Sequence, residues 1–62
     1  MNNLKKIRTS KKLSQFDLAK LSNIAPSDIS RIENGRIYAH PGWRKRLSEA
    51  LEVPEDKIFL DK

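Results

Sequence analysis

The sequence contains no cysteine, and this absence excludes two ways of stabilising a very small protein. Neither a disulfide framework nor a Cys-type zinc site can form. With 62 residues, the chain is expected to be a single domain, residues 1–62, with a thin hydrophobic core. The lack of thiols also fits a reducing compartment, so we expect a cytoplasmic protein.

Long apolar runs are missing as well. The longest clearly apolar run is Ile58-Phe59-Leu60, which is far too short to span a bilayer. The first twelve residues are basic but lack the apolar stretch of a secretory signal peptide. We therefore expect a protein that has no contact with a membrane.

The chain also lacks the residue sets that carry catalysis or hold metal ions. It has one histidine, His40, with no second candidate ligand nearby in the sequence. No Ser/His/Asp set, paired carboxylates or Gly-rich phosphate loop is visible, and so short a chain has little material to enclose a pocket. We expect that the protein is not an enzyme and that it needs no metal and no cofactor.

Positive charge, in contrast, is abundant and unevenly distributed. The net charge is +5, and residues 1–12 contain five basic and no acidic side chains. Residues 36–46 contain four basic and no acidic side chains, whereas residues 47–62 are acidic on balance. A nucleic acid would suit the two basic blocks. The alternative is that Lys and Arg only solvate helix faces, and charge alone does not decide between the two.

Helical spacing of the apolar residues, interrupted by turn residues, predicts an all-α chain without strands. The expected helices cover residues 2–11, 14–22, 26–34, 41–51 and 54–58. Ser14 is the expected N-cap of the second helix, with Asp17 placed for a capping box. Pro26 suits the first position of the third helix, and Gly35 can end it. Leu18 and Leu21 are expected to form the apolar, buried stripe of the second helix.

Residues 15–34 carry the pattern of a helix-turn-helix motif. Ala19 is small where the two helices would approach, and Asn23 can adopt the left-handed conformation at the turn. Ile29 and Ile32 would fill the core between the helices. The chain resembles the phage-repressor, Cro-like or Xre-like family of DNA-binding proteins through the frame LSQFDLAKLSN…ISRIENG and the following LSEALEV.

This resemblance implies a compact five-helix domain whose third helix, residues 26–34, enters the major groove of double-stranded DNA. The DNA-binding residues that it implies are Gln15, Pro26, Ser27, Ser30, Arg31, Asn34 and Arg36. Gln15 would hold a phosphate and Arg31 would read guanine, although Arg31 could instead be a merely solubilising residue. The resemblance also implies that Arg8 and Glu33 form a structural pair between the first and third helices.

Two positions depart from the family pattern. Ala25 stands where an N-cap Ser or Thr is common, and the lack of a capping oxygen costs about 1 kcal/mol. Pro26 stands where a relative often has a polar residue that reads a base, and it offers only apolar contact, such as to a thymine methyl group. The operator sequence therefore cannot be copied from a relative.

The function that this resemblance implies is sequence-specific regulation of transcription by a repressor of the bacterial or phage nucleoid. The alternative is a protein-interaction module with the same fold, such as the antitoxin of a toxin–antitoxin pair. No separate tail that could wrap a toxin is evident, which favours the first function. A pull-down that found a stoichiometric protein partner would favour the second.

One recognition helix reads too few base pairs for genomic specificity, so we expect a weak homodimer on a palindromic operator. Its interface is expected at the C-terminal end, through Ile58, Phe59 and Leu60, because a small core has little room for all three. The alternative is that Phe59 folds back onto Trp43 and Leu51.

Overall fold

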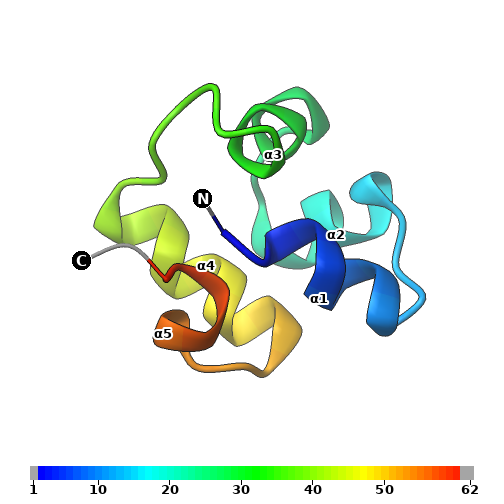
Figure 1. Cartoon of the computed structure of the whole chain (residues 1–62). Helices are drawn as coiled ribbons and strands as arrows, with labels where there is room; N and C mark the ends of the chain where they lie inside the picture. Colours follow the sequence, from blue (N-terminus) through cyan, green and yellow to red (C-terminus); the bar gives the residue numbers. More distant parts are fainter. Residues whose placement is uncertain (1, 61–62) are drawn as a thin grey trace.

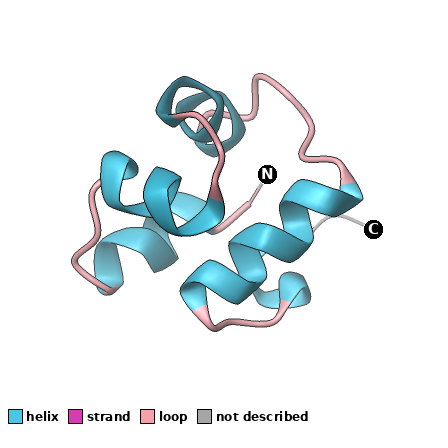
Figure 2. Ribbon diagram, turned by 180° about the vertical axis from the view of Figure 1, so that it is seen from behind, coloured by secondary structure: helices cyan, strands magenta, loops and turns pink. Residues whose placement is uncertain are grey.

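Five α-helices follow one another along residues 2–60, the part of the chain that the computed structural model describes (Figure 1). They are α1 (Leu4–Ser10), α2 (Gln15–Ser22), α3 (Pro26–Glu33), α4 (Pro41–Leu51) and α5 (Glu55–Ile58). Between residues 2 and 60 no strand is present, as Figure 2 shows from behind. The prediction of an all-α, five-helix chain is therefore confirmed, with helix ends that differ by no more than a few residues.

The second helix is bounded by its own side chains, as predicted. The Asp17 backbone N–H donates to Ser14 Oγ, and the Ser14 backbone N–H donates to Asp17 Oδ2, both at 2.9 Å. This reciprocal pair is a complete capping box. At the other end, Asn23 adopts the left-handed conformation with φ 58°. The sharp turn that leads into α3 is thus encoded by residues next to it.

The third and fourth helices both begin with proline but are capped differently. Pro26 opens α3 after Ala25, whose side chain offers no cap. Gly35, with φ +71°, follows the end of this helix. In front of α4, His40 Nδ1 accepts a hydrogen bond from the Trp43 backbone N–H at 3.3 Å. His40 is therefore an N-cap, a role that the sequence did not indicate.

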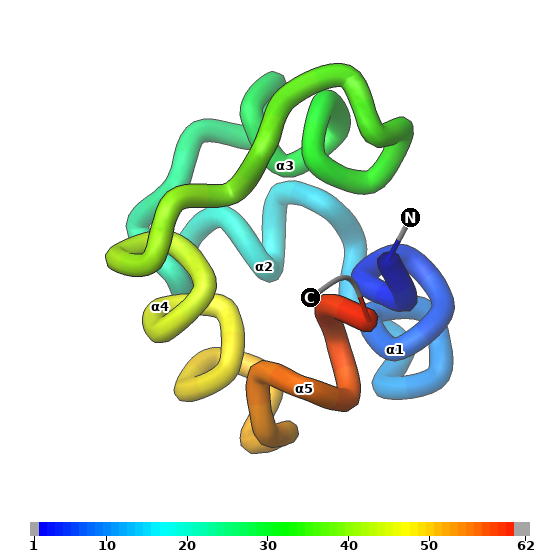
Figure 3. The backbone as a smooth tube through the Cα atoms, turned by 60° about the vertical axis from the view of Figure 1, so that its left-hand side comes forward, coloured from blue at the N-terminus to red at the C-terminus, as the bar shows by residue number. Residues whose placement is uncertain are grey.

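The helices enclose one hydrophobic core, with α2 packed against both α3 and α4 and with α5 packed against α4 (Figure 3). The buried apolar residues of the described chain are Leu4, Leu18, Ile24, Ile29, Ile32, Ala39, Leu47, Leu51, Ile58 and Phe59. Trp43 is only partly buried and packs at the edge of this cluster, beside the His40 ring. Each helix contributes at least one residue, so the core fixes the orientation of α3.

The expectation that Leu21 is buried is wrong. Leu18 is fully buried, but Leu21 is 58% exposed. Ser22 is buried instead, and its hydroxyl donates to the Leu18 carbonyl oxygen at 2.7 Å. The side of α2 that packs inward therefore contains Leu18 and Ser22, four residues apart, and Leu21 lies beyond its edge and faces the solvent.

The expected C-terminal interface is also wrong for two of its three residues. Ile58 and Phe59 are buried in the core, and only Leu60 is exposed. The physical reason is that the two ends of the described chain pair: the Asn3 backbone N–H donates to the Ile58 carbonyl at 2.7 Å, and Asn2 forms an isolated bridge with Phe59. This pairing holds residues 58 and 59 against the start of the described chain, with both side chains in the core.

The alternative, that Phe59 folds back, describes its position correctly. Phe59 belongs to the same buried cluster as Leu51, and the partly buried Trp43 packs against that cluster. The Arg44 guanidinium lies 4.6 Å from the centre of the Phe59 ring. The ring is therefore covered by a cation as well as by apolar side chains.

None of the helices found between residues 2 and 60 has the length and apolar character needed to cross a membrane.

Candidate nucleic-acid interface

The third helix divides into a buried face and an exposed face. Ile29 and Ile32 are 0% and 1% exposed and face the core. Ser27, Arg31 and Asn34 are exposed, and their spacing of four and three residues places them on one side. Figure 1 shows α3 at the edge of the molecule, away from α4 and α5. The exposed side of α3 is therefore a polar surface on a helix that the core holds in place.

Arg31 lies in the middle of this polar surface and is loosely held. Its Nη1 donates to Asp28 Oδ1 at 3.1 Å, and the two side chains are 54% and 28% exposed. Exposed ion pairs of this kind contribute only about 0–1 kcal/mol. The guanidinium can therefore leave Asp28 at low cost and bind another acceptor.

Ser30 and Asn34 are coupled to each other in the last turn of α3. Asn34 Nδ2 donates to the Ser30 carbonyl oxygen at 2.9 Å and lies 3.5 Å from Ser30 Oγ. Ser30 is half-buried, whereas Asn34 is exposed. Of the two, Asn34 is the more accessible to a partner molecule.

The two ends of the α3 surface are formed by Pro26 and Arg36. Pro26 is half-buried at the first position of the helix. Arg36 is exposed beyond Gly35, and its backbone N–H donates to the Arg31 carbonyl at 2.8 Å. The structure thus places six of the seven proposed DNA-binding residues along one short helix and the start of the following loop.

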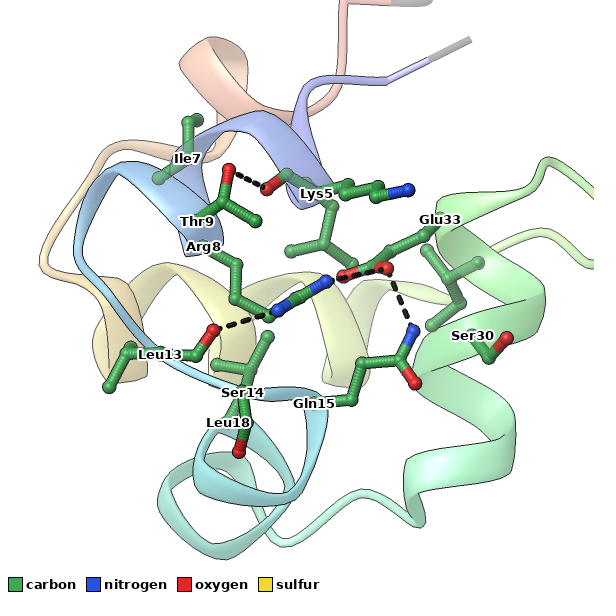
Figure 4. Close-up of polar contacts among 12 residues, drawn as sticks. Lys5, Ile7, Arg8, Thr9, Leu13, Ser14, Gln15, Leu18, Ser30 and Glu33 are labelled. Atoms are coloured by element: carbon green, nitrogen blue, oxygen red, sulfur yellow. Dashed lines mark hydrogen bonds and ion pairs between the residues drawn. The ribbon is translucent and has the colours of Figure 1, made fainter.

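The seventh, Gln15, lies beside the Arg8–Glu33 pair (Figure 4). Arg8 Nε donates to Glu33 Oε2 at 2.6 Å, and Arg8 Nη1 donates to the Leu13 carbonyl at 2.7 Å. Gln15 Nε2 donates to Glu33 Oε1 at 3.0 Å. One carboxylate therefore joins side chains of α1, α2 and α3.

This arrangement modifies the expectation for Gln15. Sequence reasoning assigned its amide to a phosphate, whereas the structure shows the amide nitrogen engaged with Glu33. An amide nitrogen carries two hydrogens, and Glu33 accepts one of them. The contact holds Gln15 at the first position of α2 and leaves the second hydrogen for another acceptor.

Several basic side chains of the described residues are exposed. The Lys side chains of α1 and of the following turn are exposed, and so are Arg36, Lys45 and Arg46. Asp17 is an acid at the start of α2. The pKa of the Asp17 carboxyl group is lowered below 3.8. The largest cause is the hydrogen bond from the Ser14 backbone, followed by the Ser14 side chain, and the charge of Lys20 contributes less. Asp17 therefore stays ionised at neutral pH.

Two exposed aromatic residues near α3 were not assigned to the interface from the sequence. Phe16 is 69% exposed and lies in a groove with Ala25 and Pro26. Tyr38 is 68% exposed, with the Arg44 guanidinium 4.8 Å from its ring centre. The sequence could have indicated Phe16. It is an apolar residue outside the buried stripe of α2, and it stands next to Gln15, which was assigned to the interface.

Within residues 2–60, no group of three or more His, Cys, Asp and Glu side chains is arranged to hold a metal ion.

Two comparisons with known proteins agree with this geometry. Residues 2–58 match the model of a family described as a helix-turn-helix domain. The chain is also 42% identical over 57 residues to the HTH-type transcriptional repressor RghR of Bacillus subtilis (strain 168). That alignment covers 90% of this chain and 42% of the relative, so the chain spans less than half of the length of RghR.

Proposed function

The chain belongs to the helix-turn-helix domain family, and we propose that it is a sequence-specific DNA-binding regulator of transcription that acts as a repressor. One observation carries this proposal: Ser27, Arg31 and Asn34 form an exposed polar face on a helix whose opposite face is locked into the core by Ile29 and Ile32. Such a helix fits the major groove of double-stranded DNA, which is wide enough to admit it.

In the proposed complex, α3 lies in the major groove and α2 crosses the backbone. Arg31 forms two hydrogen bonds with guanine O6 and N7, and Ser27 and Ser30 contact neighbouring base edges. Asn34 and Arg36 bind phosphates beyond the end of α3. The exposed lysines of α1 and the basic residues after α3 support this proposal, because phosphate neutralisation supplies much of the affinity for DNA.

Gln15 serves the same complex at the start of α2. Its hydrogen bond to Glu33 holds the amide in one orientation, and its second amide hydrogen binds a phosphate oxygen. The partial positive charge at the start of α2 favours the anion at this position. The Arg8–Glu33 pair does not itself touch DNA. It positions Gln15, the residue that binds the DNA backbone.

We further propose that two copies bind a palindromic operator, with half-sites about 10 base pairs or 34 Å apart. A single α3 reads only a few base pairs, so two must act together for specificity. Leu60 is the one apolar residue of the expected C-terminal interface that is exposed, so any pairing there is weak and is driven by DNA. The place of action that follows is the cytoplasm, on the nucleoid of a bacterium or on phage DNA.

The repressor relative favours DNA over a toxin as the partner of this chain. Selection of bound duplexes from a random DNA library tests the proposal. We expect an enriched motif with two-fold symmetry. The absence of any enriched motif would contradict sequence-specific binding, and enrichment of an asymmetric single half-site would contradict the dimer.

A further inference from the structure

The start of α3 carries an apolar surface that no core contact explains. Phe16 on α2 is 69% exposed. With Ala25 and Pro26, it lines a shallow groove of about 320 Å³ whose other walls come from the same two helices and their turn. Lys20 lies on the same groove and is exposed. The groove thus adjoins the first turn of the helix that we assign to the major groove.

The side chains of Phe16, Ala25 and Pro26 cannot read a base through hydrogen bonds. Ala25 has no polar side-chain atom and gives α3 no side-chain cap. Pro26 lacks a backbone N–H, and the Phe16 ring has no donor or acceptor. These three side chains therefore offer only apolar atoms, and the polar residues on the same groove are Lys20 and Asn23. On the major-groove edges of the four bases, the one apolar group is the C5 methyl of thymine.

We propose that Phe16, Ala25 and Pro26 form a methyl-binding surface that selects thymine at one base pair of each half-site. This inference rests on the proposed function, and it adds a specificity-determining residue, Phe16, from α2. The exposed phenyl ring widens the apolar surface beyond what Pro26 alone presents. Lys20 beside the groove favours approach of the DNA backbone.

Removal of the methyl group from DNA tests this directly. In the duplex obtained by selection, each thymine is replaced in turn by deoxyuridine, which keeps every hydrogen-bonding group and lacks only the methyl. The wild-type protein is expected to lose about 3- to 5-fold in affinity at one position of each half-site, which corresponds to one buried CH₂ group. At that same position, 5-methylcytosine is expected to bind more tightly than cytosine.

Two variants show whether Phe16 forms the surface. Phe16→Ala is expected to distinguish the thymine and deoxyuridine duplexes less than wild type at that position, because only Ala25 and Pro26 then remain to contact the methyl group. Leu21→Ala is the matched control, because Leu21 is also exposed on α2 but lines a different groove with Arg46 and Glu49. It is expected to keep the wild-type preference for thymine.

The outcomes separate the two proposals. Sequence-specific binding without any thymine-to-deoxyuridine effect in the wild type would overturn methyl selection and leave the proposed function standing. A thymine preference as large in Phe16→Ala as in wild type would overturn the role of Phe16. Failure of the wild type to prefer any duplex would overturn the proposed function itself, and this inference with it.

Discussion

Arg8 and Glu33 bind each other through two hydrogen bonds, although they are 25 residues apart: Arg8 Nε to Glu33 Oε2 at 2.6 Å and Arg8 Nη2 to Glu33 Oε1 at 3.3 Å. The two side chains are only 9% and 2% exposed. The last residue of α3 is thereby attached to α1, and through Gln15 to the start of α2. This buried pair therefore adds to the core contacts that hold the proposed recognition helix in place.

Removal of one partner of this pair should destabilise the protein strongly. Glu33→Ala leaves the Arg8 guanidinium buried without its carboxylate, and breaking a buried ion pair in this way costs about 3–5 kcal/mol. Urea denaturation measures the loss in the free energy of unfolding. Asp28→Ala is the control, because it breaks the exposed pair with Arg31 and should change stability by no more than about 1 kcal/mol. Equal, small effects of the two substitutions would contradict a structural role for Glu33.

Gln15→Ala should weaken binding to all DNA sequences by a similar factor. The side chain is proposed to hold a phosphate, and phosphate contacts position a protein without reporting sequence. Titration of the variant with the selected duplex and with a shuffled duplex measures both losses. If only the selected duplex were affected, Gln15 would be a base-reading residue, and the phosphate assignment would be wrong.

Arg31→Ala should reduce specificity. Loss of a bidentate contact to guanine costs about 1–3 kcal/mol on the preferred duplex and relaxes the preference at one base pair. Arg31→Lys keeps the charge but not the planar fork, so it should recover binding to random DNA with a weaker guanine preference than wild type. The measurement is the affinity of each variant for duplexes that carry all four bases at the contacted position. An unchanged guanine preference in Arg31→Ala would remove this residue from the reading face.

The capping box of α2 should make stability depend on acid pH in a defined direction. Hydrogen bonds from Ser14 lower the pKa of Asp17 below 3.8 in the folded protein. The folded state thus favours the ionised form, and this stabilisation is complete above pH 3.8 and is lost as the pH falls through the folded pKa. As the pH falls below 3.8, the free energy of unfolding of wild type should therefore decrease relative to that of Asp17→Asn, because the asparagine does not titrate.

An NMR titration of the Asp17 carboxyl group measures its pKa in the folded protein directly. The midpoint is expected below 3.8 in wild type and higher in Ser14→Ala, which loses the hydroxyl donor but keeps the backbone donor. A midpoint in wild type that is no lower than in Ser14→Ala would contradict the contribution of the Ser14 side chain.

Phe59 and Leu60 should behave differently although they are neighbours. Phe59 is 6% exposed and Leu60 is 59% exposed. Phe59→Ala creates a cavity in the core and should destabilise the protomer by about 3–5 kcal/mol. Leu60→Ala should leave protomer stability nearly unchanged and weaken only pairing on DNA. Thermal melts and sedimentation with the selected duplex distinguish the two effects, and equal melting temperatures of the two variants would contradict the burial of Phe59.

The parts of the fold that were predictable from sequence are those with local causes. The capping box at Ser14, the left-handed Asn23 and the helix start at Pro26 each depend on residues within one turn of the chain. The buried isoleucines of α3 followed from helical spacing. These signals are independent of how the helices pack, so they located α2 and α3 almost to the residue.

The errors arose where packing between distant segments decides the outcome. Whether Leu21 or Ser22 faces inward depends on where α4 lies against α2. Whether Phe59 is buried depends on pairing with Asn2 at the other end of the described chain. The Gln15 contact joins residues 18 apart through side chains, and no periodicity records it. The exposure of the polar residues on the proposed reading face was nevertheless predictable, because they repeat on one side of α3.

The central claim is that the exposed face of α3 reads the sequence of double-stranded DNA. The most direct test measures the affinity of the protein for the selected duplex and for a shuffled duplex of the same composition, across a range of salt concentrations. We predict that the selected duplex binds at least about 10³-fold more tightly at physiological salt. With about 4 phosphates engaged per half-site, log K should fall with log salt at a slope of roughly −3 to −4 per protomer. Equal affinities for the two duplexes, or a slope near zero, would contradict the account.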